Sequence, residues 1–577
     1  MIIHNSSSSI FSHTISRRSF CQGKSLEFFG WIGYFEKITD LEGIMRLRYN
    51  GKLFQIRAHT QEERSALSKM KHVTYNKEED WFETKLFRIA KEFIESSHDY
   101  RTRSTLESFS EKWDFSWATA PSKGFSVPSN EGLQYLDYQL AGIEYMMRNP
   151  GVLLADEPGT GKTIQIAGYL NSLPEIKRAL IICPSSLRLN WKRELDKWLV
   201  DKSRKVTLDP KDDEAFAHIV SFSSVWRPNV FPFLDKRKYD VVAIDEAHNC
   251  KNDEAKRTIQ SLHLAKKAFR KVLMTGTPLV NRPIELFPLL NCLDEKRWPN
   301  KFAFAFEYCS AHYEDIYVYD KQKGHAVKKS VLNMSGASNL PSLSEKLRGS
   351  MMIRRLKSDV LPQLPKKRRQ LIEIPLETKD CKAAIKEEAK RWAKLCDLYG
   401  YEECVRQMEF GEGVAFTEMA AKRKEVALSK IPFCVEYLKD LLEGVDKVVV
   451  FAHHRAVVDL LTDELKEYNP VKVVGGMSDK QKQESVDSFQ ENENVHLFIG
   501  NIQAAGVGYT LTKSSIVVFV ELAFVPGLMS QAEDRCVRIG ATADYVLVQH
   551  LVLEKSLDKD LCSMLIHKQE IADKILN

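Results

Sequence analysis

A glycine-rich loop after a short apolar run constrains this chain more than any other feature of its sequence. The run is Gly151–Leu154, and the loop reads ADEPGTGKT over residues 155–163. A buried strand that leads into such a loop cradles nucleotide phosphates, because the loop amides and the N-terminus of the following helix point at the anion. The residues that we expect to contact ATP or its magnesium ion are Gly159, Thr160, Gly161, Lys162 and Thr163.

Two of these residues have distinct expected roles. The Lys162 ammonium reaches the β- and γ-phosphates, and the Thr163 hydroxyl binds Mg²⁺. Asp156 stands where the usual pattern has its first glycine. The loop alone is therefore a good indication of a nucleotide site, and a second motif has to support it.

That second motif is the tetrapeptide Asp-Glu-Ala-His at residues 245–248, directly after the apolar run Val241–Ile244. A carboxylate at a strand end next to a phosphate loop belongs to the magnesium site, so we expect Asp245 to contact the metal. We expect Glu246 to act as the base that orients and activates the attacking water.

Two further segments fit the same site. Thr275 and Thr277 lie in Thr-Gly-Thr-Pro after another apolar run, and we expect their hydroxyls to relay the nucleotide state to bound nucleic acid. Upstream of the loop, the amide of Gln139 can both donate to and accept from an adenine edge. We therefore interpret Gln139 as the adenine-reading residue.

A third motif lies near the C-terminus and contains Gln531, Arg535 and Arg538. A spacing of three predicts that both guanidinium groups share one helical face. Arginines delivered across a cleft stabilise the charge that develops in phosphoryl transfer, so we count these three residues as catalytic. Gly508 lies in Gly-Val-Gly-Tyr-Thr, and its bare backbone would permit close approach to a phosphate or a ribose.

The alternation of apolar and helical stretches predicts two α/β lobes, each a doubly wound parallel sheet. With 577 residues the chain has room for about three or four domains of roughly 150 residues. Residues 380–435 are charged and strand-poor, which indicates a helical arm. The expected strands are 152–155, 179–183, 218–221, 241–244 and 272–274, then 448–451, 471–474, 495–499, 516–520 and 545–552.

Upstream of every nucleotide motif, the sequence predicts a small α+β module. A hairpin over Met45–Arg57 would turn at Asn50-Gly51, with Leu47 opposite Phe54. A second hairpin would join residues 73–75 to 81–82, and a helix would follow over 87–94. The module is either a structural cap with a solvated basic face or a DNA-contacting recognition module.

The division that we predict is 1–24, a targeting or disordered segment; 25–125, the N-terminal module; 126–370, the first lobe; and 371–577, the arm and second lobe. The first segment is serine-rich and lacks acidic residues, as in an organellar transit peptide, but a disordered polar N-terminus is the favoured explanation.

Composition excludes some classes of protein. Eleven cysteines include no CxxC pair, which argues against zinc and for a reducing compartment. No apolar stretch approaches the ~18 residues needed to span a bilayer. Nucleus, organelle, bacterial cytoplasm and virus-infected cell all stay compatible with the sequence.

The net charge of +6 is too small to indicate nucleic-acid binding, so local clusters carry that argument. Such clusters are commonly solvated faces, but these flank the junction of the lobes, which favours contact with DNA phosphates. They are Arg354, Arg355 and Lys357; Lys366, Lys367, Arg368 and Arg369; and Lys422, Arg423 and Lys424.

With these motifs in place, the chain resembles the Swi/Snf family of superfamily 2 helicase-like ATPases over roughly residues 130–575. Residues 352–365 (MIRRLKSDVLPQLP) and the segment from Val518 to Arg535 resemble its SMARCA-like, HepA-related annealing-helicase branch, as does the segment 336–340. The N-terminal module looks more distantly like the HARP-type module of that branch.

The resemblance implies two RecA-like lobes and ATP-driven translocation on duplex or branched DNA, without processive unwinding. In this branch the motor rewinds strands and acts on forks in replication and repair. Two positions depart from the family pattern: Val537 stands for a histidine and Ala541 for a glutamine. Neither supplies a group assigned to phosphate chemistry, so ATP hydrolysis is expected to persist, with altered coupling to DNA.

Two other functions stay open at this point. One is a strand-separating RNA or DNA helicase of the DEAH type; the other is a catalytically idle DNA-binding scaffold. For the leading interpretation we expect ATP and Mg²⁺ as cofactors, DNA as partner, no membrane association and a monomer.

Overall fold

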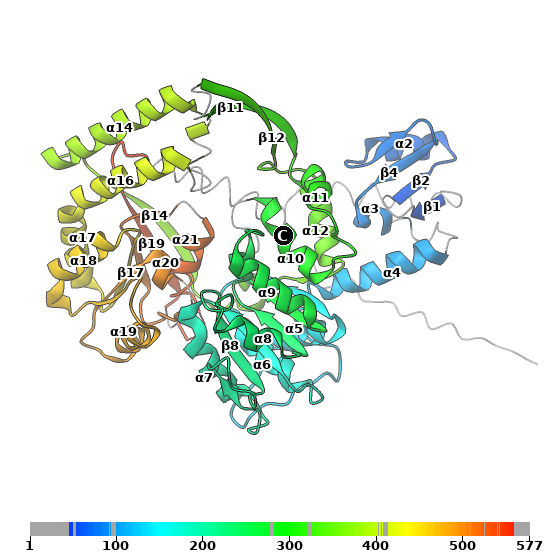
Figure 1. Ribbon diagram of the computed structural model, residues 1–577, viewed down its shortest axis with the longest axis horizontal. Coiled ribbons are helices and arrows are strands. Elements are labelled where there is room, and N and C mark those ends of the chain that lie inside the picture. The colour runs from blue at the N-terminus through cyan, green and yellow to red at the C-terminus, as the bar shows by residue number, and fades with distance from the viewer. Residues whose placement is uncertain are drawn as a thin grey trace, which may run out of the picture. The chain divides into compact units, whose positions relative to one another are not determined.

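The computed structural model describes residues 46–49, 54–91, 93, 100–276, 282–320, 325–401, 403–404, 407, 413–506, 508–523, 526–538, 540–541 and 543–558. The chain forms two compact units, Met1–Glu107 and Ser108–Asn577, drawn as ribbons in Figure 1. Within those ranges, no helix has both the length and the apolar character required to cross a bilayer.

The first unit contains a four-stranded antiparallel sheet in the order β1-β2-β4-β3. A capping box between Thr60 and Glu63 starts helix α2, and α2 and the sheet bury a small apolar core. The elements are β1 (Arg46–Tyr49), β2 (Phe54–Arg57), α2 (Gln61–Lys69), β3 (Thr74–Asn76), β4 (Trp81–Thr84) and α3 (Phe87–Lys91).

Both predicted hairpins are present, but the register of the first was predicted wrongly. Leu47 pairs with Ile56 and Tyr49 with Phe54, a shift of two residues from the expected pairing of Leu47 with Phe54. The connection therefore takes four residues, 50–53, which lie outside the described ranges together with the predicted Asn-Gly turn. Because side chains alternate with a period of two, this shift leaves Leu47 and Ile56 on the buried face.

The first lobe of the second unit is a seven-stranded parallel sheet in the order β13-β5-β10-β9-β6-β8-β7. Every apolar run predicted for this lobe is a strand, and β7 and β13 are additional. The strands are β5 (Gly151–Leu154), β6 (Ala179–Cys183), β7 (Val206–Thr207), β8 (Ala217–Ser221), β9 (Val241–Ile244), β10 (Arg270–Met274) and β13 (Met352–Ile353).

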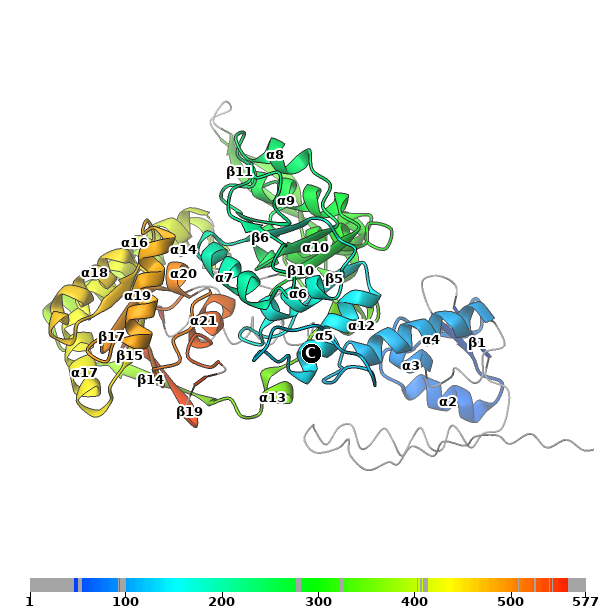
Figure 2. The ribbon, with the colours of Figure 1, turned by 90° about the horizontal axis from the view of Figure 1, so that it is seen from below.

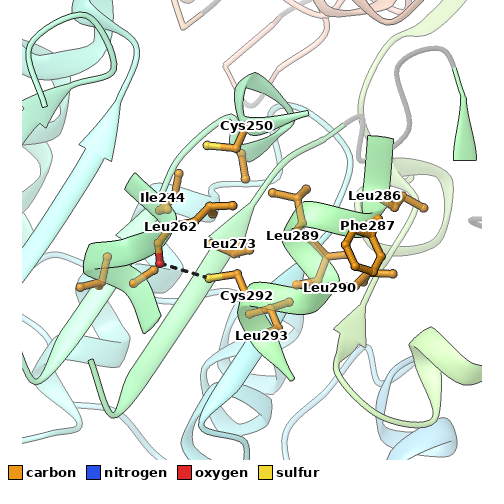
Figure 3. Close-up of a cluster of buried hydrophobic side chains, with 14 of the residues drawn as sticks. Ile244, Cys250, Leu262, Leu273, Leu286, Phe287, Leu289, Leu290, Cys292 and Leu293 are labelled. Atoms are coloured by element: carbon orange, nitrogen blue, oxygen red, sulfur yellow. Dashed lines mark hydrogen bonds between the residues drawn. The ribbon is translucent and has the colours of Figure 1, made fainter. Parts of the chain in front are cut away.

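Both faces of this sheet are buried, which explains why its strands are continuously apolar. Leu153, Ile244 and Leu273 lie in the core on one face, and Val152 and Val272 lie in the core on the other. Figure 3 shows the first of these cores, where the Cys292 thiol donates to the Leu262 carbonyl over 3.8 Å.

The helices of this lobe precede, connect or follow its strands. A β-hairpin, β11 (His312–Asp320) with β12 (His325–Asn333), is inserted between α11 and α12. The helices are α4 (Tyr100–Phe115), α5 (Asp137–Arg148), α6 (Lys162–Asn171), η2 (Ser185–Leu187), α7 (Arg188–Trp198), α8 (Phe231–Asp235), η3 (Ala247–Cys250), α9 (Lys256–Lys267), η4 (Pro283–Leu286), α10 (Phe287–Leu293), α11 (Lys301–Tyr308), α12 (Leu340–Arg348) and α13 (Lys357–Val360).

The second lobe is a six-stranded parallel sheet in the order β14-β19-β18-β15-β17-β16. The five apolar runs predicted for it are strands, so the prediction of two RecA-like α/β lobes is confirmed. The strands are β14 (Lys366–Ile374), β15 (Val448–Ala452), β16 (Val471–Val473), β17 (Leu497–Asn501), β18 (Ile516–Phe519) and β19 (Tyr545–Leu553).

Strand β14 was not predicted, because its sequence is charged. It is an edge strand that pairs in parallel with β19, and edge strands commonly carry lysine or arginine, which blunts unwanted pairing. The basic cluster 366–369 is thus the start of a strand.

Helices surround this second sheet, and Figure 2 shows α18 and α19 beside it. In the region 380–435, where we predicted a helical arm, helices α14 and α16 pack against each other (Figure 1). The helices are α14 (Lys379–Tyr399), α16 (Gly413–Ser429), α17 (Ile431–Gly444), α18 (Arg455–Glu464), η5 (Lys466–Tyr468), α19 (Asp479–Glu491), α20 (Ile502–Ala505) and α21 (Pro526–Glu533).

Candidate active site

The predicted nucleotide residues of lobe one gather at the carboxyl ends of neighbouring parallel strands. The loop 155–163 follows β5, Asp245 follows β9 and Thr275 follows β10. Since β5, β10 and β9 are adjacent in the sheet, these segments lie at one edge. This edge is where open α/β sheets bind ligands.

The backbone of the loop has the form of an anion cradle. Gly159 and Gly161 have φ angles of 86° and 77°, in the left-handed region that favours glycine. Gly161 is the N-cap of α6 and supplies no side-chain cap, which leaves the first-turn amides available to a ligand. Lys162 Nζ donates to the carbonyls of Asp156 and Glu157 over 2.8 and 3.1 Å.

Asp156, which replaces the first glycine of the usual pattern, forms a buried ion pair with Arg355. Asp156 Oδ1 accepts from the Arg355 backbone N–H over 3.0 Å and from Arg355 Nε over 2.9 Å, and Oδ2 accepts from Gln165 over 3.0 Å. Burial opposes ionisation, yet Arg355 holds the pKa of Asp156 below its usual range. The departure from the glycine pattern therefore fixes the loop to the 354–357 segment.

Gln139 holds the same loop from the other side. Its Oε1 accepts from the Leu136 N–H over 3.0 Å at the start of α5, and its Nε2 donates to the Thr160 carbonyl over 3.3 Å. The Tyr138 hydroxyl donates to the same carbonyl over 2.8 Å. Gln139 thus braces the phosphate loop, and its role as adenine reader stays a prediction.

Asp245 is oriented by Trp191, a residue that the sequence reasoning missed. Trp191 Nε1 on α7 donates to Asp245 Oδ2 over 2.8 Å, and the Glu246 backbone N–H donates to Oδ1 over 2.9 Å. Burial and the neighbouring Glu246 raise the pKa of Asp245. A tryptophan at the second turn of a helix carries no signal of this role, because most such residues are simply core.

Glu246 has a φ of 49°, which is uncommon outside glycine and holds the side chain in the site. Its buried Oε2 has no hydrogen-bond partner among the described residues. His248 Nδ1 lies 3.3 Å away but shares a hydrogen bond of 2.9 Å with Thr275 Oγ1. Burial lowers the pKa of His248 to about 4, so it is neutral near pH 7.

This contact joins the Asp-Glu-Ala-His segment to Thr275, as a relay of the nucleotide state would require. Thr277, the other predicted relay residue, lies outside the described residues. Thr163 occupies the second position of α6, beside Lys162.

The C-terminal arginines come from lobe two and lie beside this site. The position that a Cβ would occupy on Gly159 is 3.2 Å from Arg538 Cγ. Arg535 and Arg538 both favour the ionised form of Glu246 electrostatically, although burial raises its pKa. The two lobes therefore bring Gly159, Lys162, Glu246 and the two arginines together.

One detail of this prediction was wrong. The two arginines do not share a helical face, because α21 ends at Glu533 and they follow it in turns. Arg535 Nε donates to the Gln531 carbonyl over 2.7 Å, and Arg538 Nη1 donates to Thr510 Oγ1 over 3.1 Å. Gln531, itself buried, thus orients Arg535 through its backbone.

Gly508 was expected to let its backbone approach a phosphate or a ribose. Its φ is 88°, and a Cβ there would overlap the Leu187 side chain of lobe one. The bare backbone therefore allows close contact between the two lobes at η2, and in this structure its neighbour is Leu187.

Four residues predicted to contact DNA are engaged inside the protein instead. Arg354 donates to the Ala155 carbonyl over 2.8 Å, and Arg355 pairs with Asp156 as described above. Lys357 and Lys367 each lie 2.8 Å from Asp534 Oδ1.

A run of basic residues in a sequence does not show whether the side chains face solvent or the protein interior. Here Arg355 pairs with Asp156, and Lys357 and Lys367 pair with Asp534, inside the protein. Arg369 binds Glu533 over 2.6 Å, but its side chain stays exposed. Lys366 and Arg368 are exposed and stay candidates for phosphate contact. In the third cluster Arg423 is buried, 3.1 Å from Asp558.

The residues at this site fit ATP with a magnesium ion. Two left-handed glycines, a helix N-terminus without a side-chain cap and Lys162 suit the phosphates. The buried Glu246 Oε2, which has no hydrogen-bond partner among the described residues, suits a bound water. The Thr163 hydroxyl and the Asp245 carboxylate are oxygen ligands of the kind that Mg²⁺ prefers.

Models of protein families match both lobes. Residues 138–383 match the SNF2-related domain, and residues 430–540 match the helicase conserved C-terminal domain. The chain belongs to the SNF2 family. Its Asp-Glu-Ala-His tetrapeptide therefore does not make it a DEAH-box helicase, which corrects the name suggested by those four letters.

Curated relatives of this SNF2 protein include the SWI/SNF-related matrix-associated actin-dependent regulator of chromatin subfamily A-like protein 1 of Xenopus tropicalis. It is 33% identical over 462 residues, 77% of this chain and 45% of the relative. The DNA annealing helicase and endonuclease ZRANB3 of Bos taurus is 32% identical to this chain. The alignment covers 78% of this chain and 41% of the length of ZRANB3. The chain thus spans less than half the length of these two relatives.

One similar solved structure is the Sulfolobus solfataricus SWI2/SNF2 ATPase core in complex with dsDNA. The alignment covers 78% of this chain and 95% of the chain in that structure. The sequence identity is 19% and the TM-score is 0.35.

Proposed function

We propose that this SNF2 protein is an ATP-driven translocase that tracks on duplex or branched DNA. We further propose that its movement serves strand annealing or fork remodelling in replication and repair. The observation that carries the proposal is Arg538 of lobe two against Gly159 in the phosphate loop of lobe one. A site completed by both lobes couples the state of the nucleotide to their relative position.

Each site residue has a part in this proposal. Lys162 balances phosphate charge, Thr163 and Asp245 hold Mg²⁺, and Glu246 orients the attacking water. Arg535 and Arg538 stabilise the negative charge that develops during hydrolysis. Bound ATP supplies the phosphoanhydride bond whose cleavage drives the cycle.

The DNA part of the proposal is supported by family membership and by relatives named as DNA annealing helicases. Lys366 and Arg368, exposed on β14, are the residues of the 354–369 segment that we propose for phosphate contact. Each such contact contributes about 0.9 to the log–log slope of affinity against salt.

Two measurements test the proposal. ATPase rates should rise with linear, forked or four-way DNA more than with structured RNA; a preference for RNA would instead identify an RNA helicase. Arg538→Ala should lower kcat by about 10³-fold or more while ATP still binds.

Lys162→Ala serves as the inactive reference, with DNA binding retained. If the wild-type protein binds DNA but hydrolyses no ATP, it is instead the catalytically idle DNA-binding scaffold.

A further inference from the structure

A single lysine in the segment between the sheets contacts both halves of the site. The Lys357 backbone N–H donates to Glu157 Oε2 in the phosphate loop over 2.6 Å. Lys357 Nζ lies 2.8 Å from Asp534 Oδ1 and donates to the Val537 carbonyl over 3.0 Å. Lys357 thus joins the loop of lobe one to the turns that carry the two arginines.

The same side chain lies directly against the loop glycine that faces Arg538. The position of a Cβ on Gly159 is 3.5 Å from Lys357 Nζ and 3.2 Å from Arg538 Cγ. Lys357 and Arg538 therefore flank one backbone position of the phosphate loop. A movement of the Lys357 contact would be transmitted to the arginine beside it.

Asp534 is held from two sides. Lys357 and Lys367 each lie 2.8 Å from its Oδ1, and only 3% of the residue is exposed. Burial lowers the pKa of Lys357 to about 8, whereas the two lysines hold the pKa of Asp534 below its usual range. Both side chains are therefore charged at pH 7, and each buried charge is compensated by the opposite charge of the other.

The contact between Lys357 and Asp534 lies beside a cavity. A cavity of about 480 Å³ borders Glu157, Lys357, Asp534 and Val537. Cys536 and Val537 of the arginine turns pack in the core of lobe two, and the bonds of Lys357 join these turns to the phosphate loop of lobe one.

We propose that the Lys357–Asp534 pair sets the position of Arg538 over the phosphate loop and thereby governs the rate of the chemical step. The inference rests on the proposed ATP hydrolysis. In it Lys357 is a positioning residue, and Arg538 is the residue that touches the reacting phosphate.

The test compares Lys357→Met, Asp534→Asn and the double variant in the full chain. Each single substitution should lower kcat by about a hundredfold, the scale of an ångström misplacement of a catalytic group. The affinity for a fluorescent ATP analogue should stay unchanged. The loss in the double variant should be much smaller than the product of the two single losses, because both substitutions remove the Lys357–Asp534 contact.

Lys480→Met is the matched control, since this lysine on α19 is exposed and distant in sequence from every motif. It should retain wild-type kcat. An unchanged kcat in Lys357→Met, or single effects that multiply in the double variant, would refute the positioning role.

A second readout needs no nucleotide. Backbone amide exchange in residues 534–541 should become faster in Lys357→Met, because the bond to the Val537 carbonyl is lost. Unchanged exchange there would overturn the inference even in a protein that hydrolyses no ATP. Absence of wild-type ATPase would refute the proposed function alone.

Discussion

At the scale of single residues, the site depends on groups that hold the catalytic candidates as much as on the candidates themselves. Trp191 fixes Asp245, Gln139 fixes the carbonyl of Thr160, and the Gln531 backbone fixes Arg535. Such supporting bonds set the geometry that electrostatic catalysis requires.

The indole of Trp191 gives a prediction at this scale. Trp191→Phe removes one hydrogen bond to a charged acceptor, worth about 1.5–3 kcal/mol. If the whole of that is expressed in the transition state, kcat falls by about tenfold to a hundredfold. Steady-state ATPase assays at varied Mg²⁺ should also show a higher half-saturating concentration.

Trp198→Phe is its matched control, because this tryptophan on the same helix donates to Glu194 over 3.1 Å, away from the site. Equal losses in the two variants would show that the effect comes from α7 as a whole and would remove Trp191 from the magnesium site.

At the scale of elements, the second lobe ties its helical arm to the end of the described chain. Glu388 on α14 accepts from the Leu557 N–H over 3.0 Å. Asp558, the next residue, binds Arg423 on α16 over 3.1 Å and lies 3.7 Å from Lys430. These buried charges secure α14 and α16 to the lobe, which explains why the basic cluster at 422–424 is partly internal.

Glu388 gives a pH-dependent prediction. Burial is the main cause that raises its pKa from 4.5 to about 7; Asp558 adds to the shift, while Arg423 and Lys430 oppose it. The folded state then binds a proton that the unfolded state releases between pH 4.5 and 7. Stability from this group is present below that window and falls as pH rises through it, by about 3 kcal/mol at most.

Glu388→Gln should therefore raise Tm relative to the wild type at pH 8 and leave it similar at pH 5, as measured by calorimetry. Glu387→Gln, on the exposed side of α14, is the control. A Tm difference that is the same at both pH values would contradict the assignment.

At the scale of the whole molecule, the second unit is the proposed motor and the first is a separate small fold. Helix α4 spans their boundary, and its last turns belong to lobe one. Phe109 lies against Gly349, and Arg348 stacks on the Trp117 ring at 3.3 Å. A deletion that tests the first unit should therefore end before α4.

Removal of residues 1–99 should leave ATPase activity without DNA unchanged, because every proposed catalytic residue lies in the second unit. It should reduce the preference for forked over linear duplex, as measured by DNA-stimulated ATPase. Arg48→Ala tests the basic face in the intact fold, where Arg48 lies 4.2 Å from the centroid of the Trp81 ring. Unaltered fork preference in both proteins would make the unit a structural cap.

The sequence alone determined the central strands of the two sheets and the motifs of the candidate nucleotide site. Each core strand is an apolar run, because both faces of a parallel sheet are buried, and each phosphate-binding candidate follows such a run directly. The residues that neighbour each motif along the chain were therefore enough to predict the roles of 155–163 and 245–248.

Only the tertiary structure decided where the charges point. Arg355 and Lys357 read as a surface for DNA, but Asp156 and Asp534, 199 and 177 residues away, take them into the interior. The meeting of Arg538 with Gly159 likewise depends on the packing of two lobes. The physical reason is that a buried ion pair requires a partner at close range, and a sequence does not show which distant residues become neighbours.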